Sequence, residues 1–289
     1  MDYIEHTPPS DLRRYVQCLW LLRDDAPEED VQVIYPDGRC ELLAELGVPL
    51  RLRGVDGQIR SDQPLCFAAQ QSGPIRLQAG GTIFCIGVRL QPTASALVAG
   101  RRLPGLRDHA PDLHTLDAAF ALKFGAAART CATAGSQQPL WDLLRERCAS
   151  FSLDSLIEQA IVKLDTLEGD LRINELARQL DISPRSLQVR FLAAVGLTPK
   201  EYARVRRLQA LLRTLDAEAT DIAAAATLHG YTDQAHATHD LVSWTGFTPG
   251  RLVRALRNDR CSDDAVRLAA AFLRGTSTTR VRQVLRAPM

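Results

Sequence analysis

The side chains with the clearest chemistry lie on a short helix that the sequence predicts over 184–194. Ser183 is a good N-cap residue and a proline follows it, which marks the start of the helix. Helical spacing turns Leu187 and Phe191 toward a core. The outer face carries Arg185, Ser186, Gln188, Val189 and, further round, Arg190. Arginine can form paired hydrogen bonds with guanine, and glutamine with adenine, so this face is suited to reading DNA bases.

A second helix of the same kind is predicted from Thr232 to about Ser243. Its outer face carries Gln234, Ala235, His236, Thr238 and His239. Glutamine and histidine can exchange hydrogen bonds with base edges, and threonine can contact a thymine methyl group or a phosphate. The second half of the chain therefore holds two candidate reading faces.

The elements around these two helices repeat in the same order. In the first unit a short helix over 173–180 precedes the reading helix, and Gly196-Leu197-Thr198-Pro199 follows it. In the second unit a short helix over 221–228 precedes the reading helix, and Gly246-Phe247-Thr248-Pro249 follows it. A long helix over 198–215 would join the units. Two helix-turn-helix units on one rigid helix can meet successive major-groove faces of DNA.

The chain resembles the AraC/XylS family of bacterial regulators in ISPRSLQVRF (182–191), GLTPKEYARVRRL (196–208) and GYTDQAHATHDLVSWTGFTP (230–249). The resemblance covers about Leu156 to Arg254. It implies a seven-helix pair of helix-turn-helix subdomains that regulates transcription, with the second helix of each unit in the major groove. HTPPSDLRRYVQCLW, YPDGRCELL and GVRLQP are similar to the N-terminal domain of one AraC subgroup. That similarity implies a domain that senses an effector or dimerises the protein.

The charge pattern departs from this resemblance in the second unit. Nine basic and three acidic residues lie within 171–213, whereas 214–250 has no Lys or Arg and five acids. Relatives commonly carry arginine at the positions of Val189, Leu192, His239 and Val242. Because neutralised phosphates supply much of the affinity for DNA, we expect the second unit to bind weakly.

Three roles are open for the second unit. It could dock loosely on DNA while the first unit sets the choice of sequence. It could instead present a surface to a protein partner such as RNA polymerase. In the third interpretation, His236 and His239 add positive charge when they are protonated. On the joining helix, phosphate contacts or salt bridges are expected for Arg204, Arg206 and Arg207.

The 289 residues suit an α+β protein of more than one domain. We expect a mostly-β regulatory domain, a small barrel or sandwich, over 1–115, and a helical linker that could dimerise the protein over 116–152. An all-α AraC-type domain over 153–256 and a tail over 257–289 with an extra helix at 263–273 would follow. Turn signals place strands at 31–35, 40–46, 64–69, 75–78 and 82–90, while 12–22 fits either helix or strand.

In the front domain, polar side chains flank one turn and end one strand. Asp37, Arg39 and Glu41 surround the Pro36-Asp37-Gly38 turn, and Arg89 ends an apolar strand. We expect these four residues to bind an effector, with Arg89 pairing a carboxylate group. The alternative is that they are ordinary turn residues and an exposed strand end.

Several classes of protein do not fit the sequence. It has no GxSxG, HExxH or phosphate-binding glycine loop, so neither enzyme activity nor a cofactor is expected. Its seven cysteines form no CxxC pair, so neither a metal site nor a disulfide framework is expected. The start lacks a secretory pattern, and no window of about twenty residues is free of charge, so a cytoplasmic protein that does not enter the membrane is expected.

The expected partners are double-stranded DNA, an unidentified small-molecule effector, RNA polymerase and a second copy of the chain. The competing interpretation is an AraC-like protein-interaction module in which DNA binding has weakened. The absence of basic residues at Val189, His239 and Val242 favours that alternative, whereas the capping signals and Arg185 oppose it.

Overall fold

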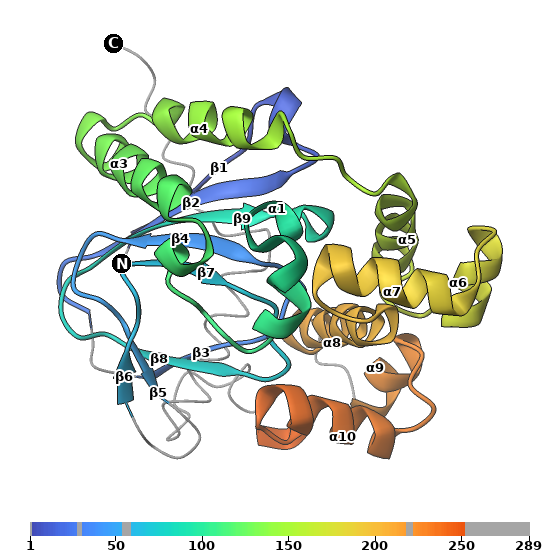
Figure 1. Cartoon of the computed structure of the whole chain (residues 1–289). Coiled ribbons are helices and arrows are strands. Elements are labelled where there is room, and N and C mark those ends of the chain that lie inside the picture. Colours follow the sequence, from blue (N-terminus) through green and yellow to red (C-terminus); the bar gives the residue numbers. More distant parts are fainter. Residues whose placement is uncertain (1, 28–30, 54–58, 218–221, 252–289) are drawn as a thin grey trace, which may run out of the picture.

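The computed structural model describes residues 2–27, 31–53, 59–217 and 222–251. The expected helix at 263–273 and the last cysteine, Cys261, lie outside this part of the chain. The described chain starts with strands and ends with helices, in the order that the sequence predicted (Figure 1).

The front region consists of two antiparallel sheets. The first sheet has the order β1 (Asp2–His6), β2 (Val16–Asp24), β9 (Ile83–Leu90), β4 (Glu41–Glu45) and β7 (Leu65–Ala68). The second has the order β3 (Val31–Ile34), β8 (Ile75–Gln78), β5 (Arg51–Arg53) and β6 (Ile59–Ser61). All five predicted strands are present, and the ambiguous region 12–22 falls largely in β2. Strands β1, β5 and β6 were not predicted from the sequence.

Helices cover one face of the first sheet. They are α1 (Ala96–Ala99), α2 (Leu113–Leu116), α3 (Ala118–Ala134) and α4 (Gln138–Cys148). Leu42 and Ile86 of the sheet share one buried cluster with Phe124 and Leu140 of these helices. The segment expected as a linker over 116–152 therefore contributes to the core of the front domain, because the apolar faces of α3 and α4 are buried against the sheet.

The other face of the first sheet packs an indole ring against a glycine. A Cβ atom added to Gly87 would lie 2.1 Å from Cε2 of Trp20, so only glycine lets the ring lie this close to β9. The Nε1 of Trp20 donates a hydrogen bond of 3.2 Å to Glu41 on the neighbouring strand. This contact places aromatic and charged side chains together on the face that does not carry the helices.

The second half of the described chain is all helix. It contains α5 (Ser155–Thr166), α6 (Ile173–Gln179), α7 (Pro184–Val195), α8 (Pro199–Ala217), α9 (Ile222–Leu228) and α10 (Gln234–Thr245). Gly196 and Gly246 end α7 and α10 with φ of +83° and +76°, the left-handed conformation that glycine adopts readily. The two predicted units and the helix that joins them are confirmed. The seventh helix that the resemblance implies would follow Pro249 and falls mostly outside the described residues.

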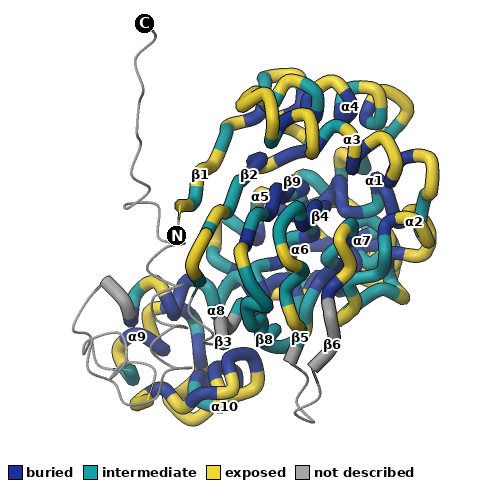
Figure 2. Tube along the Cα trace, turned by 90° about the vertical axis from the view of Figure 1, so that its left-hand side faces the viewer, coloured by how far each residue is buried: buried dark blue, intermediate teal, exposed yellow. Residues whose placement is uncertain are grey.

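The helical region packs directly against the front region. Tyr35 belongs to the same buried cluster as Phe191, Tyr202 and Val205 of α7 and α8. Helix α7 also contacts the short helical segments that follow β9, as Figure 1 shows. Burial along the trace in Figure 2 alternates on α10, which packs against α9 and whose buried Asp240 accepts a hydrogen bond from Arg204 of α8. Among the described helices, none is long and apolar enough to cross a membrane.

Candidate nucleic-acid interface

The first reading helix, α7, is held by its cap and its inner face. Ser183 caps it by accepting a hydrogen bond of 3.1 Å from the backbone nitrogen of Ser186. Its buried residues are Leu187, Phe191 and Val195. The other side exposes Arg185, Gln188 and Val189, and 61% of the surface of Val189 is accessible to solvent. Neither Arg185 nor Gln188 forms a hydrogen bond or an ion pair within the described chain, so both side chains are free to contact a partner.

Arg190, unlike Arg185 and Gln188, is already paired within the fold. Its Nε and Nη2 donate hydrogen bonds of 2.8 and 2.6 Å to the carboxylate of Asp154. The same carboxylate caps α5 by accepting hydrogen bonds from the backbone nitrogens of Leu156 and Ile157. Arg190, predicted as a DNA contact, therefore ties α7 to the start of α5. This pair could not be predicted from local sequence patterns because Asp154 lies 36 positions away.

The arginines of α8 are engaged in the same way. Arg204 donates to Asp240 of α10 at 2.7 Å and lies over the ring of Trp244 at 5.5 Å. Arg206, also predicted as a DNA contact, is only 19% exposed, and its Nε forms an ion pair of 2.8 Å with Asp165 of α5. Arg207 donates to the carbonyl oxygen of Gly169 at 3.0 Å. Of the two roles expected for these arginines, the geometry therefore favours salt bridges and internal contacts.

The second reading helix, α10, has a different surface. Asp233 caps it by accepting a hydrogen bond of 2.7 Å from the backbone nitrogen of His236. The outward residues predicted for this face are exposed except Thr238, which is half-buried; they are Gln234, Ala235, His236, Thr238 and His239. His236 also lies 3.1 Å from the Thr232 hydroxyl and packs edge-on against Tyr231. His239 is 80% exposed, with its Nδ1 3.9 Å from Asp240.

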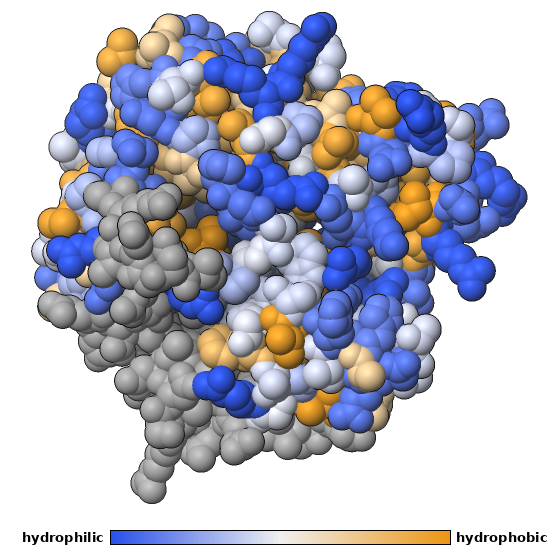
Figure 3. Space-filling view, turned by 60° about the horizontal axis from the view of Figure 1, so that its bottom comes forward, coloured by the Kyte–Doolittle hydropathy of each residue, from blue (hydrophilic) through white to orange (hydrophobic). Residues whose placement is uncertain are grey.

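The two units differ in the positive charge they offer. Arg172, Arg185 and Lys200 of the first unit are exposed and form no ion pair within the described chain. No lysine or arginine occurs between 214 and 250. Asp240, counted in the sequence as one of the repelling acids, is 4% exposed and paired with Arg204, so it does not act as a free surface charge. Figure 3, which brings the α10 side forward, shows small apolar patches separated by hydrophilic side chains on the described part of this face.

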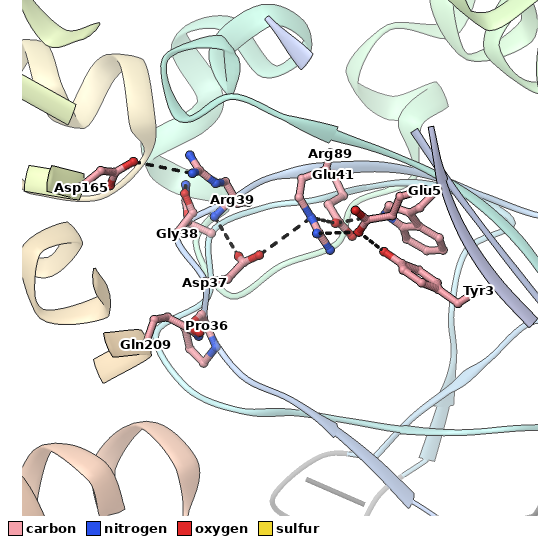
Figure 4. Close-up of polar contacts among 12 residues, drawn as sticks. Tyr3, Glu5, Pro36, Asp37, Gly38, Arg39, Glu41, Arg89, Asp165 and Gln209 are labelled. Carbon is pink, nitrogen blue, oxygen red and sulfur yellow. Dashed lines mark hydrogen bonds and ion pairs between the residues drawn. The ribbon is translucent and has the colours of Figure 1, made fainter. Parts of the chain in front are cut away.

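A cluster of charged groups lies in the front domain, between its two sheets and the helical region (Figure 4). Arg89 Nε lies 2.7 Å from Glu41 Oε1 and 4.0 Å from Asp37 Oδ2, and its Nη1 lies 3.6 Å from Glu5. Tyr3 donates a hydrogen bond of 2.6 Å to Glu5. Burial lowers the pKa of Arg89, but the carboxylates of Glu41 and Asp37 outweigh it and raise that pKa, so the guanidinium stays charged.

Three of the four predicted effector residues therefore come together: Asp37, Glu41 and Arg89. Tyr3 and Glu5 join them, and neither was predicted because their strand, β1, was not predicted. Asp2–His6 shows no strict alternation of buried and exposed positions, so no local pattern marked it as a strand.

Arg39, the fourth predicted effector residue, points to the helical region instead. Its Nη2 lies 3.7 Å from Asp165 of α5. The same turn contributes two further contacts to α8. The carbonyl oxygen of Pro36 accepts a hydrogen bond of 2.6 Å from Gln209, and a Cβ atom added to Gly38 would lie 3.0 Å from the Tyr202 ring. One turn, Pro36–Arg39, thus touches the Arg89 cluster with Asp37 and the helical region with its other residues (Figure 4).

Comparison with known families gives two matches. The family described as "Helix-turn-helix domain" matches residues 176–255, and the family described as "Domain of unknown function (DUF6597)" matches residues 4–112. No curated protein is similar enough in sequence to count as a match.

Several solved structures are weakly similar to the chain, among them the following three. ToxT from Vibrio cholerae is 8% identical with a TM-score of 0.44, over 88% of this chain and 98% of that chain. ToxT from strain SCE256 bound to an unsaturated fatty acid is 9% identical with a TM-score of 0.42, over 82% and 95%. The AraC-like transcriptional activator CuxR is 16% identical with a TM-score of 0.28, over 71% and 85%. All three TM-scores lie below 0.5.

Proposed function

We propose that the protein is an AraC-like regulator of transcription that reads a specific DNA sequence, mainly through its first unit; the match of residues 176–255 to the family described as "Helix-turn-helix domain" supports this proposal. The observation that carries the proposal is the outer face of α7. Arg185 and Gln188 are exposed and have no partner within the described chain, whereas Leu187 and Phe191 hold the helix in place. Unengaged donors and acceptors on a rigid helix are suited to contacts with base edges.

In this proposal the second unit docks beside the first and adds little affinity. Its reading helix offers no lysine or arginine, and an acidic cap, Asp233, stands at the helix end that would otherwise attract a phosphate. The same surface favours the second candidate function, a protein-interaction module. Protonation of His236 and His239 is the third role for this surface, and a rise in DNA affinity from pH 8 to pH 6 would support it.

We further propose that the front domain controls the DNA-binding domain through the Pro36–Arg39 turn. Asp37 of this turn lies beside Arg89, while Arg39 and Pro36 contact α5 and α8. An effector that carries a carboxylate would compete with Asp37 and Glu41 for the Arg89 guanidinium. Movement of Asp37 would then shift the contacts that the turn makes with Asp165 and Gln209.

The test of DNA reading starts from a site that the whole chain selects from random DNA. Affinity for that site and for scrambled DNA is then measured with Arg185→Ala and with Arg178→Ala. Arg178 is 74% exposed, pairs with Glu175 on α6 and serves as a control for the loss of one charge. Arg185→Ala should weaken binding to the selected site by about 1–3 kcal/mol, which is roughly 5- to 150-fold, and affect scrambled DNA far less. Equal losses on both DNAs, or no enriched site, would favour the interaction module.

The test of coupling uses the front domain. Arg89→Met removes the centre of the charged cluster without touching the DNA-binding domain, and it should change the affinity for the selected site by roughly fivefold or more, the lower range for coupling between two sites. Lys123→Met, an exposed change on α3 whose lysine pairs with Glu146, is the control and should leave the affinity unchanged. The same affinity for both variants would refute control through the turn.

A further inference from the structure

We propose that α7 recognises the 5-methyl group of thymine through Val189, so that the DNA site of this protein carries a thymine where this residue meets the major groove. The inference rests on the proposed function and names one base of its target. It begins from the 61% exposure of Val189, a large apolar side chain.

Val189 does not contribute to the packing of α7 against the core. The buried side chains of this helix are Leu187, Phe191 and Val195, and they supply its contacts with the core. Val189 lies on the opposite side, one turn after Arg185 and one turn before the exposed Ala193. A single exposed valine is ordinary on a protein surface. Val189, however, shares the outward side of α7 with Arg185 and Gln188, two exposed polar residues that have no partner within the described chain.

The chemistry of the major groove narrows what such a side chain can bind. Base edges there present hydrogen-bond donors and acceptors, and thymine adds the one apolar group, its C5-methyl. A valine offers no hydrogen bond and no charge, so it can neither read a guanine nor neutralise a phosphate. Its isopropyl group holds one strongly preferred rotamer in a helix, so little side-chain freedom is lost on contact. Arg185 and Gln188 would fix the helix in the groove while Val189 packs on the methyl group.

The experiment removes the methyl group from DNA one thymine at a time. The whole chain selects a site from an unmethylated random library, and each thymine of that site is replaced by deoxyuridine, which keeps the base pair and lacks the methyl. One replacement should weaken binding roughly fourfold, the effect of burying one methyl-sized group. Val189→Ala should weaken binding to the thymine site and abolish this sensitivity to uracil.

Two further variants separate the explanations. Val162→Ala alters another exposed valine, 63% exposed on α5, and should keep the uracil effect unchanged. Val189→Arg should shift the preferred base at that position from thymine to guanine. At the thymine position, DNA with 5-methylcytosine should bind more tightly than DNA with cytosine if the protein recognises the methyl group. Because the selection library is unmethylated, enrichment of thymine at this position would show that thymine supplies the methyl group in the natural site.

The outcomes distinguish this inference from the proposed function. A site that is selected but shows no position sensitive to uracil would overturn the thymine contact and leave DNA reading intact. A uracil effect that persists in Val189→Ala would assign the methyl contact to another residue and likewise overturn it. If no site is enriched at all, both the proposed function and this inference fail.

Discussion

A double-mutant cycle of Asp240→Asn and Arg204→Met should reveal a strong energetic coupling between α8 and α10. The Arg204 guanidinium lies 2.7 Å from the Asp240 carboxylate, and the side chains are 36% and 4% exposed. Removal of either partner leaves the other charge without its main hydrogen bond. A hydrogen bond to a charged group contributes about 1.5–3 kcal/mol, and we expect a coupling near the lower end because Arg204 is partly open to solvent.

A second ion pair on the same domain provides the matched control. Arg178 and Glu175 lie 2.6 Å apart, almost the same distance, but are 74% and 36% exposed. The corresponding variants are Arg178→Met and Glu175→Gln. Since solvent screens an exposed pair, its coupling should be close to zero. The comparison therefore varies burial while the distance between the charges is nearly constant.

Urea unfolding of the whole chain gives the free energy of unfolding for each variant, and the double-mutant cycle isolates the pair. Fluorescence of Trp244 helps to assign the change, because Arg204 lies over its ring. A coupling for Arg204 and Asp240 no larger than that of the exposed pair would refute the reasoning. It would also mean that α10 is not locked to α8, and that the spacing of the two reading helices is not fixed by this contact.

Two further predictions concern the front domain. Burial raises the pKa of the Glu45 carboxyl from 4.5 to about 7, so the folded protein keeps a proton that the unfolded chain releases. The free energy of unfolding should therefore fall as the pH rises from 4.5 through 7. Glu45→Gln should flatten this pH dependence and gain up to about 3 kcal/mol of stability at pH 8. Urea unfolding at pH 5 and pH 8 measures both effects, and an unchanged pH dependence in the variant would contradict the prediction. Gly87→Ala would place a Cβ atom 2.1 Å from the Trp20 ring. The clash should reduce the free energy of unfolding by about 3 kcal/mol and lower the melting temperature by roughly 5–10 °C. An unchanged melting temperature would show that the ring can move away freely.

The helix-turn-helix units could be predicted from the sequence because their signals are local. The N-cap at Ser183 and the glycines after α7 and α10 lie next to the elements they delimit. The strands that were missed are short or carry few apolar residues. β5 and β6 have three residues each, and β1 is exposed or half-buried throughout, so their pairing depends on partners that the local pattern does not show.

The candidate site was harder to predict because it depends on distant partners. The helical spacing placed Arg190 further round α7 than Arg185, but it could not show that Arg190 meets the carboxylate of Asp154, which caps α5. Arg39 and Arg206 both meet Asp165, although they come from different domains. The charge pattern shows the basic region, but it could not show which of its cations are already neutralised within the fold.

Binding of the whole chain to the DNA upstream of its own coding region, compared with scrambled DNA at the same salt concentration, tests the central claim most directly. If the first unit reads DNA bases, the upstream DNA should bind on the order of a thousandfold more tightly, the lower range for sequence-specific proteins. Equal, weak binding to both DNAs would contradict DNA reading and would make the protein-interaction module the leading account.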